Sequence, residues 1–319
     1  MRRHKLLALS TAALALGITS AGCGVSDSGD DGDSASGKAT VCMETEFPDR
    51  PDGLVLFEKA TGYKIPQSQI KILDTGLIYT ETDKGNCDFG EVFTTDGRIQ
   101  ALNIDLVDDP GVFILYNLSF TWQDKVYEQH ADTYDAIADG IFDGLDEDKM
   151  AELNGKVDVE GEPVKDVAEE YLDSVGMLDG GNELDGVKLT VGSKDFTENI
   201  LVGEMLSQAL EAQGADVNDK TNLGGTSVAR DALLNGNIDV YPEYNGTGWT
   251  VHLGKEDPSS DPQELFDKTS TLDLKQNGIK WVGRSPFNDT YGFAVNGDLN
   301  DSDGPFDLEK MAEYLKDHQ

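Results

Sequence analysis

The chain has 319 residues, with 25 lysines and arginines against 61 aspartates and glutamates, which gives a formal net charge of −36 at pH 7. So acidic a protein repels polyanions, and this disfavours nucleic acid and anionic lipid surfaces as partners. The length beyond the N-terminal segment exceeds one typical hydrophobic core, which predicts two lobes.

The first residues have the layout of a secretory signal. A basic head at residues 2–5 precedes an apolar run from Leu6 to Ile18, and small residues lead to Cys23. This run is too short to cross a bilayer, so we expect a signal peptide over residues 1–22. Cys23 resembles the acylated cysteine of bacterial lipoproteins, although Ser20 stands where leucine is usual. An ordinary signal peptide with an incidental cysteine is the alternative.

The segment that follows Cys23 is composed almost wholly of serine, glycine, aspartate and alanine. Such a composition buries too little apolar surface to offset the entropy of ordering, so residues 23–39 are predicted to be a lipidated cysteine and a flexible tether. We therefore expect an exported protein that is held at the outer face of the cytoplasmic membrane by its N-terminal lipid.

Short β-rich runs alternate with helical runs after the tether. This alternation is typical of mainly parallel sheets covered by helices, and it predicts an α/β fold. Helices are predicted over 54–60 and 76–82, and strands over 70–73, 88–93 and 187–192.

The clearest helix is predicted over 197–213, with Thr197 as its N-cap and Glu198 in its first turn. Apolar residues at i, i+4 spacing give it a face built for a core. Residues 122–178 are nearly all helical in pattern, with aspartate- and glycine-rich joints. Further strands are predicted over 217–222, 238–241, 280–283 and 292–296, and further helical segments over 227–235, 247–252 and 264–276.

Two cysteines remain besides Cys23. Cys42 and Cys87 each open an apolar segment, so they could lie on neighbouring strands and pair in an oxidising compartment, with two free buried thiols as the alternative. The four histidines are isolated, and no motif for a metal, a cofactor or a catalytic nucleophile is found. We therefore expect a protein that is not an enzyme and needs no cofactor.

Two tyrosine-rich stretches, 241–247 and 287–291, place aromatic rings beside acidic or hydroxyl side chains at the ends of strand-like runs. A quaternary ammonium cannot donate hydrogen bonds, and aromatic faces attract it electrostatically by roughly 0.5 to 2 kcal/mol per ring. These stretches therefore favour a cage for a methylated cation. For any one ring taken alone, ordinary core packing is the competing interpretation.

Several long motifs resemble one family. Residues 191–198, 222–226, 239–247 and 288–291 resemble the opening half of the glycine betaine/choline solute-binding proteins of ABC importers. Residues 46–54, 93–99 and 108–111, with Tyr116 and Asn117, resemble its closing half. The resemblance covers nearly all of the chain after the tether, and it implies a two-lobed periplasmic-binding-protein (type II) clamshell.

The two halves stand in exchanged order, since the part that usually closes such proteins comes first. A circular permutation accounts for this order, because the same contacts can form with a different cut in the chain. A fragment of a longer duplicated protein is the alternative. The resemblance implies a discontinuous lobe of residues 40–93 plus 255–319, a continuous lobe of residues 94–254, and a hinge at the two junctions.

The resemblance also implies a ligand site. Phe93 stands where many relatives have tyrosine, so it offers a ring face without a hydroxyl. Asp289 would add negative charge near the ammonium, while Lys194, Arg50 and the Thr247 hydroxyl would meet a carboxylate. The cage walls would be Tyr244, Tyr291, Tyr116 and Phe93.

The function expected from the resemblance is capture of glycine betaine or a related quaternary ammonium compound, for delivery to a membrane permease driven by an ATPase. A choline-specific binder is the first rival, because choline lacks the carboxylate that Lys194 and Arg50 would meet. A surface sensor that uses the same clamshell without transport is the second. An exported enzyme is a third, but it would need a nucleophile or metal that the sequence does not offer.

Overall fold

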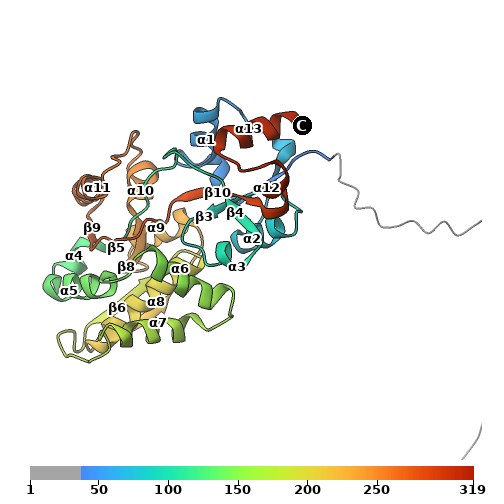
Figure 1. The fold of residues 1–319 in the computed structure, drawn as a ribbon. Coiled ribbons are helices and arrows are strands. Elements are labelled where there is room, and N and C mark those ends of the chain that lie inside the picture. The colour runs from blue at the N-terminus through green and yellow to red at the C-terminus, as the bar shows by residue number, and fades with distance from the viewer. Residues whose placement is uncertain (1–36) are drawn as a thin grey trace, which may run out of the picture. The chain divides into compact units, whose positions relative to one another are not determined.

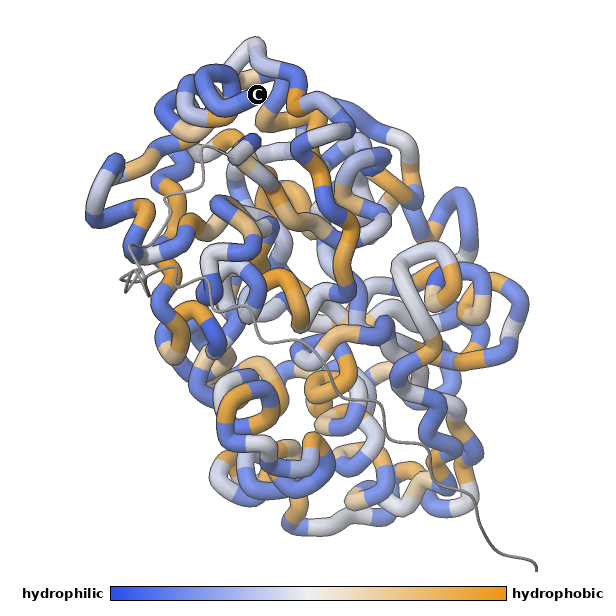
Figure 2. Tube along the Cα trace, turned by 90° about the vertical axis from the view of Figure 1, so that its right-hand side faces the viewer, coloured by the Kyte–Doolittle hydropathy of each residue, from blue (hydrophilic) through white to orange (hydrophobic). Residues whose placement is uncertain are grey.

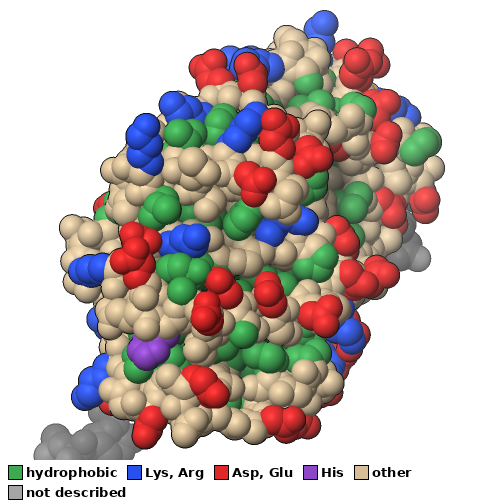
Figure 3. Space-filling view, turned by 90° about the vertical axis from the view of Figure 1, so that its left-hand side faces the viewer, with side chains coloured by type: hydrophobic (Ala, Val, Ile, Leu, Met, Phe, Trp, Pro, Cys, Tyr) green, Lys and Arg blue, Asp and Glu red, His purple; other side chains and the backbone are tan. Residues whose placement is uncertain are grey.

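The computed structural model describes residues 37–319, of which residues 38–319 form one compact unit. The expected signal peptide, the lipidation site at Cys23 and most of the tether lie outside the described residues. No helix in the part described is both long and apolar enough to cross a membrane. On the face shown in Figure 3, acidic side chains are spread over the surface with basic ones between them.

The first sheet has the strand order β2-β1-β3-β10-β4. Strands β3, β10 and β4 of this sheet are labelled in Figure 1. Strands β1, β3 and β10 are buried along nearly all of their length, as expected for strands covered on both faces. The strands are β1 Val41–Met43, β2 Ile70–Ile72, β3 Phe89–Phe93, β4 Ile104–Leu106 and β10 Tyr291–Asn296. The accompanying helices are η1 Phe47–Asp49, α1 Leu54–Thr61, η2 Gln67–Gln69, α2 Thr75–Asp83, α3 Arg98–Ala101, α12 Gly297–Asp303 and α13 Leu308–Asp317.

The second sheet has the order β7-β6-β8-β5-β9. Its strands are β5 Leu118–Gln123, β6 Lys188–Gly192, β7 Asp216–Lys220, β8 Val240–Tyr244 and β9 Ile279–Val282. Its helices are α4 Asp124–Tyr127, α5 Ala131–Phe142, α6 Glu147–Asp158, α7 Val164–Ser174, α8 Thr197–Ala212, α9 Thr226–Leu234, α10 Asn245–Thr247, η3 Gly248–His252 and α11 Pro262–Asn277.

The expected two-lobed α/β architecture is confirmed, but the sheets are mixed rather than mainly parallel. In the first sheet β1 is parallel to β2 and β3, and in the second β6 is parallel to β7 and β8. Strands β10 and β5 are antiparallel to both of their neighbours. These two strands follow the points where the chain passes between the sheets, so each enters its sheet from the opposite side.

Helix α8 begins at Thr197 as expected, with Phe196 rather than Thr197 in the cap position. The predicted apolar face is buried, but polar residues such as Glu204, Ser207 and Gln208 are buried too. The reason is that α5, α6 and α7 pack over the side that faces away from the sheet. Figure 2 shows hydrophobic and hydrophilic residues alternating in short stretches along the chain.

The chain passes between the sheets in two segments, residues 107–117 and 283–290, which we call the crossing segments. They are joined by hydrogen bonds: the Asn117 Nδ2 donates to the Phe287 carbonyl at 2.7 Å, and the Tyr116 N–H donates to Asn288 Oδ1 at 2.6 Å. Within residues 37–319 these two segments are the covalent links between the sheets, and two such joined segments have the geometry of a hinge.

The division between the lobes differs from the one expected at residues 93/94 and 254/255. Strand β4 pairs with β10 and stays in the first sheet, while β9 pairs with β5 and stays in the second. We therefore define the first lobe as residues 38–106 and 291–319, and the second as residues 118–282. Long-range strand pairing decides this division, and it leaves no local signal in the sequence.

The two ends of the compact unit lie together. The Ala39 N–H donates a hydrogen bond to the His318 carbonyl at 2.8 Å, so the start of β1 is tied to the end of α13. Close to this point the structure joins Cys42 and Cys87 in a disulfide, with their Cα atoms 5.8 Å apart. Cys42 lies on β1, and Cys87 lies just before the neighbouring strand β3.

Candidate functional site

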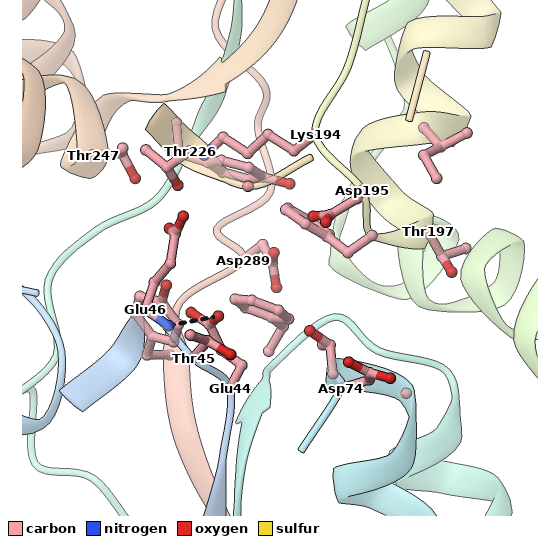
Figure 4. Close-up of a pocket in the computed structure, with 18 of the residues that line it drawn as sticks. Glu44, Thr45, Glu46, Asp74, Lys194, Asp195, Thr197, Thr226, Thr247 and Asp289 are labelled. Carbon is pink, nitrogen blue, oxygen red and sulfur yellow. Dashed lines mark hydrogen bonds between the residues drawn. The ribbon is translucent and has the colours of Figure 1, made fainter. Parts of the chain in front are cut away.

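A cavity of about 490 Å³ is lined by residues from both lobes and from both crossing segments. In Figure 4, Asp289 lies between Lys194, Thr226 and Thr247 on one side and Glu44, Glu46 and Asp74 on the other. The lining residues are Glu44, Thr45, Glu46, Leu73, Asp74, Thr75, Gly76, Phe93, Arg98, Tyr116, Lys194, Asp195, Phe196, Thr197, Ile200, Gly225, Thr226, Tyr244, Thr247, Asp289 and Tyr291.

Five aromatic rings of this lining form a cluster that we call the aromatic box: Phe93, Tyr116, Phe196, Tyr244 and Tyr291. The Tyr116 ring meets the rings of Tyr291 and Tyr244 edge-on, with centroids 5.3 Å and 6.3 Å apart. Phe196 stacks on Phe93 at 5.1 Å and on Tyr244 at 6.0 Å. The four rings expected to form a cage are thus brought together, and Phe196 completes them.

Strand pairing positions most of these rings. Tyr291 opens β10 directly opposite Phe93, the last residue of β3. Tyr244 ends β8 opposite Leu118, so Tyr116 lies two residues beyond the same edge of the second sheet. The ends of strands from both sheets therefore converge on one cavity, with the box rings attached to rigid elements.

A buried acidic pair lies beneath the box. Asp289 and Glu198 are 3% and 4% exposed, and both contact the Thr95 hydroxyl, at 2.7 Å and 2.6 Å. The Tyr244 hydroxyl donates to Glu198 Oε1 at 2.8 Å. Burial raises the pKa of both carboxyls, and the charge of Glu198 raises that of Asp289 further. The hydrogen bond from Tyr244 opposes this effect at Glu198 and favours its ionised form, which places a negative charge directly behind a box ring.

Lys194 lines the cavity but already has a partner. Its Nζ lies 2.6 Å from Glu243 Oε1 and 5.2 Å from the centroid of the Tyr244 ring. Glu243 is fully buried and also bonds to His252 Nε2 at 2.8 Å. Burial alone would raise the pKa of Glu243, but the neighbouring Lys194 and His252 hold it below its ordinary range. Lys194 and Glu243 thus form a neutral buried pair at the cavity wall.

Arg50 is not among the residues that line the cavity. Its Nε and Nη2 donate to the two oxygens of Asp52, at 2.8 Å and 2.9 Å. Nη1 donates to Thr226 Oγ1 at 3.0 Å, and Nη2 donates to Thr247 Oγ1 at 3.1 Å. Arg50 thus lies behind two threonines, and its guanidinium also lies 5.5 Å from the centroid of the Tyr291 ring and 3.4 Å from Glu46 Oε2.

These contacts leave hydrogen-bond donors facing the cavity. Because Thr226 Oγ1 and Thr247 Oγ1 each accept from Arg50, the hydrogen of each hydroxyl is left to donate elsewhere. The Tyr116 hydroxyl is buried, and it has no hydrogen-bond partner within the described part of the chain. The two threonine hydroxyls, with the Lys194 ammonium, suit an acceptor such as a carboxylate or a hydroxyl oxygen.

Sequence reasoning missed three features of this site. From the sequence, Phe196 is simply an apolar residue directly before a helix, and Glu198 is an acidic residue in the first turn of that helix. Both residues belong to the motif at 191–198, which also contains Lys194. Their closeness to Lys194 in the sequence was the one available signal that they belong to the site. Thr226 likewise ends the motif at 222–226, directly before the helix expected from residue 227, and the sequence assigned no role to its hydroxyl.

No group of histidine, cysteine, aspartate or glutamate side chains suited to a metal ion occurs among residues 37–319. The cavity combines aromatic rings, a buried acidic pair beneath them and hydroxyl donors. Aromatic faces backed by buried negative charge attract a cation at one end, while hydroxyl hydrogens attract an acceptor at the other. This arrangement is suited to binding a small ligand that has a cationic end and a polar end.

The chain is similar to a known protein family and to several known proteins. Residues 12–174 and 187–317 match a sequence model of the family described as the substrate-binding domain of ABC-type glycine betaine transport systems. The glycine betaine-binding protein YehZ of Escherichia coli is 34% identical over 128 residues, 40% of this chain and 42% of that one. The carnitine transport binding protein OpuCC of Listeria monocytogenes is 30% identical over 132 residues, 41% and 42% of the two chains.

The chain thus spans about two fifths of the length of the curated relatives that it matches. Among solved structures, a phosphate-binding protein of a Streptococcus pneumoniae ABC transporter aligns with a TM-score of 0.43 at 11% identity. That alignment covers 89% of this chain and 97% of the other.

Proposed function

Because the chain belongs to the family of substrate-binding domains of ABC-type glycine betaine transport systems, we propose that it captures a quaternary ammonium compound, with glycine betaine as the first candidate. It is a binding protein and not an enzyme, since the family consists of transporter components. The observation that supports this ligand class is the aromatic box, in which five rings line one cavity above the buried pair Asp289 and Glu198.

In this proposal the methylated nitrogen lies in the aromatic box. Each ring face contributes roughly 0.5 to 2 kcal/mol of attraction when the cation is desolvated. Methyl groups also bury apolar area against the rings, at about 25 cal/mol per Å². An unmethylated ammonium would lose several hydrogen bonds to water on entering the same space, so the box selects the methylated form.

The carboxylate of glycine betaine would meet the hydroxyls of Thr226 and Thr247, with the Lys194 ammonium nearby. Arg50 supports this end indirectly, because its hydrogen bonds orient the two threonine hydroxyls. Lys194 and Arg50 contribute less to carboxylate binding than the sequence predicts, because Glu243 and Asp52 already neutralise their charges. These buried pairs are the observation that favours a second candidate, choline, which has a hydroxyl in place of the carboxylate.

The same contacts link ligand capture to closure of the lobes. Arg50 joins the first lobe to Thr226 and Thr247 of the second, and Thr95 joins the first to Glu198 of the second. A ligand that touches both lobes stabilises the closed form, because only that form offers all of its contacts at once. The closed form would then dock on a membrane permease that an ATPase drives, which are the partners we propose.

Two further features belong to the proposal. We propose export and anchoring through acylated Cys23, which would keep the binding body near its permease. We also propose that the chain is circularly permuted. Support comes from the hydrogen bond between Ala39 and His318, which shows that the present ends are adjacent, and from the family match, which falls in two stretches separated at residues 175–186.

The test of the proposed function is calorimetric titration of the protein with glycine betaine, proline betaine, carnitine and choline, each beside an unmethylated counterpart such as glycine or ethanolamine. We expect at least one methylated compound to bind and its counterpart to bind far more weakly. A sensor that does not transport would give the same titration, and uptake measurements after deletion of the permease would distinguish it. No binding by any methylated ammonium would overturn the proposal.

A further inference from the structure

The Thr95 hydroxyl lies between two buried carboxyl groups in an arrangement that requires a proton. Its Oγ1 is 2.6 Å from Glu198 Oε2 and 2.7 Å from Asp289 Oδ1. A hydroxyl has one hydrogen to donate, and an ionised carboxylate can only accept. If both carboxyls were ionised, one of these short contacts would set lone pair against lone pair. One of the two carboxyls therefore carries a hydrogen.

The surrounding donors show which carboxyl that is. Glu198 receives hydrogen bonds from the Tyr244 hydroxyl at 2.8 Å and from Asn154 Nδ2 at 3.2 Å, and both favour its ionised form. Among residues 37–319, the one N–H that donates to the Asp289 carboxyl is that of Thr95, at 3.3 Å. The proton therefore belongs on Asp289, whose Oδ1 donates to Thr95 Oγ1, which in turn donates to Glu198. We call these three residues the proton triad.

The cations around the proton triad are engaged elsewhere. Arg98 is paired with Asp96 and Asp158, and Lys194 is paired with Glu243. The triad therefore has no free cation beside it among the described residues, and one of its two possible negative charges stays neutralised by the proton. The titratable groups that face it are Tyr244 from β8, Asp158 from α6, Tyr79 from α2, Asp96 and Arg98 from the start of α3, and Lys194 from the loop after β6.

We propose that the proton triad holds one proton when the aromatic box is empty and releases it when a methylated ammonium enters. This inference rests on the proposed function. The O–H bond of Asp289 breaks, its electron pair stays on the carboxylate, and the proton passes to water. The ligand's charge then compensates the negative charge of Asp289, which lines the same cavity as the box rings. The contact between Asp289 Oδ1 and Thr95 Oγ1 lengthens at the same time, because no hydrogen remains between the two oxygens, while Thr95 keeps its hydrogen bond to Glu198.

The direction of the pH dependence follows. Release of a proton on binding means that affinity for the cation rises with pH while the triad titrates, and levels off once the triad is fully ionised. Burial and the charge of Glu198 raise the pKa of Asp289 well above its ordinary value, so this rise occurs above the range where an ordinary aspartate titrates. An uncharged ligand of the same shape would release no proton.

The experiment is titration calorimetry with choline and glycine betaine in pairs of buffers that differ in ionisation enthalpy, repeated over a series of pH values. The slope of the binding enthalpy against buffer enthalpy counts the protons released. We expect a fraction of one proton, falling to zero at alkaline pH. The carbon analogue of choline, with a tert-butyl group in place of the trimethylammonium, should release none.

The variants Asp289→Asn and Glu198→Gln each leave a single carboxyl that needs no shared proton, so each should abolish both the release and the pH dependence. Asp74→Asn, which removes an exposed carboxylate at the rim of the same cavity, should retain both. Cation binding without proton release in the unmodified protein would overturn the inference and leave the proposed function standing, whether or not the variants fold. Absence of any cation binding would overturn the proposed function itself.

Discussion

Arg50 of the first lobe donates a hydrogen bond from Nη2 to Thr247 Oγ1 of the second lobe, at 3.1 Å, while Asp52 holds the same guanidinium. The bond leaves the Thr247 hydrogen free to donate into the cavity. One side chain therefore both links the lobes and prepares a donor for the ligand. This makes Arg50 a positioning residue rather than a direct ligand contact.

Replacing Thr247 with valine tests this relationship, because the shape is kept and the hydroxyl is lost. A hydrogen bond to a charged acceptor contributes about 1.5 to 3 kcal/mol, so affinity for glycine betaine should fall about tenfold to a hundredfold. Choline offers only a neutral partner, and its affinity should fall by about two- to tenfold. Calorimetry with both ligands measures the difference.

Arg50→Ala should show the same preference, with a larger loss for glycine betaine than for choline. Equal losses for the two ligands in both variants would contradict a carboxylate at this end of the cavity. In that case choline, or another ligand without a carboxylate, would become the first candidate.

The box rings can be tested one at a time. Tyr244→Ala and Tyr291→Ala each remove a ring face, and a loss of roughly 0.5 to 2 kcal/mol per ring corresponds to about a two- to thirtyfold weaker binding of the methylated ligand. Tyr244→Phe is the matched control, since it keeps the ring and loses only the hydrogen bond to Glu198. Full affinity in both alanine variants would return these rings to a purely structural role.

The buried pair of Lys194 and Glu243 predicts a stability effect. Lys194→Met leaves Glu243 buried without its closest cation, and breaking such a pair lowers the free energy of unfolding by about 3 to 5 kcal/mol. Lys188→Met is the control, because Lys188 pairs with Asp216 at the exposed surface, where a pair contributes at most about 1 kcal/mol. Urea unfolding of both variants checks the contrast. Similar losses would mean that the Lys194 pair adds nothing to stability.

Glu91 predicts a pH dependence of stability. It is fully buried, and its Oε2 accepts the Glu44 N–H at 2.7 Å. Burial, and then the charge of Glu44, raise its pKa well above the ordinary value. The folded protein therefore binds this proton more tightly than the unfolded chain does, and the contribution of Glu91 to the free energy of unfolding decreases as pH rises between the two pKa values.

Glu91→Gln should remove that contribution while keeping an acceptor oxygen. The free energy of unfolding of this variant, relative to the unmodified protein, should thus increase from acidic to alkaline pH. Glu169→Gln, on an exposed position of α7, serves as the control and should show no such trend. A constant difference between Glu91→Gln and the unmodified protein at every pH would contradict the raised pKa.

The proposed permutation can be tested by moving the chain ends. Joining Gln319 to Lys38 by a short linker and opening the chain between residues 176 and 186 should give a protein with the same ligand affinity, because Ala39 and His318 already touch. Calorimetry on the rejoined protein measures this. If the rejoined chain failed to fold while the original order folded, the present order would be essential and the permutation account would lose its support.

Sequence patterns predicted the α/β class and most helices, while the family resemblance implied four rings of the box. In the structure these rings lie together because strand ends of both sheets converge on one cavity. The predicted lobe boundaries were wrong. Strand β4 has only three residues and gives no clear pattern in the sequence, and β9 belongs to the second sheet because it pairs with β5, which is distant in the chain. Glu198 and Thr95 could not be paired from the sequence, because they are 103 residues apart and meet only when the lobes come together. The indirect role of Arg50 was likewise set by contacts across the lobes.

The most direct test of the central claim is a crystal structure of the protein bound to glycine betaine. The account predicts the methylated nitrogen within about 6 Å of the ring centroids of Tyr116, Tyr244 and Tyr291, with the carboxylate directed towards Thr226 and Thr247. A ligand whose nitrogen lay outside the aromatic box, with the rings packed only against one another, would contradict it.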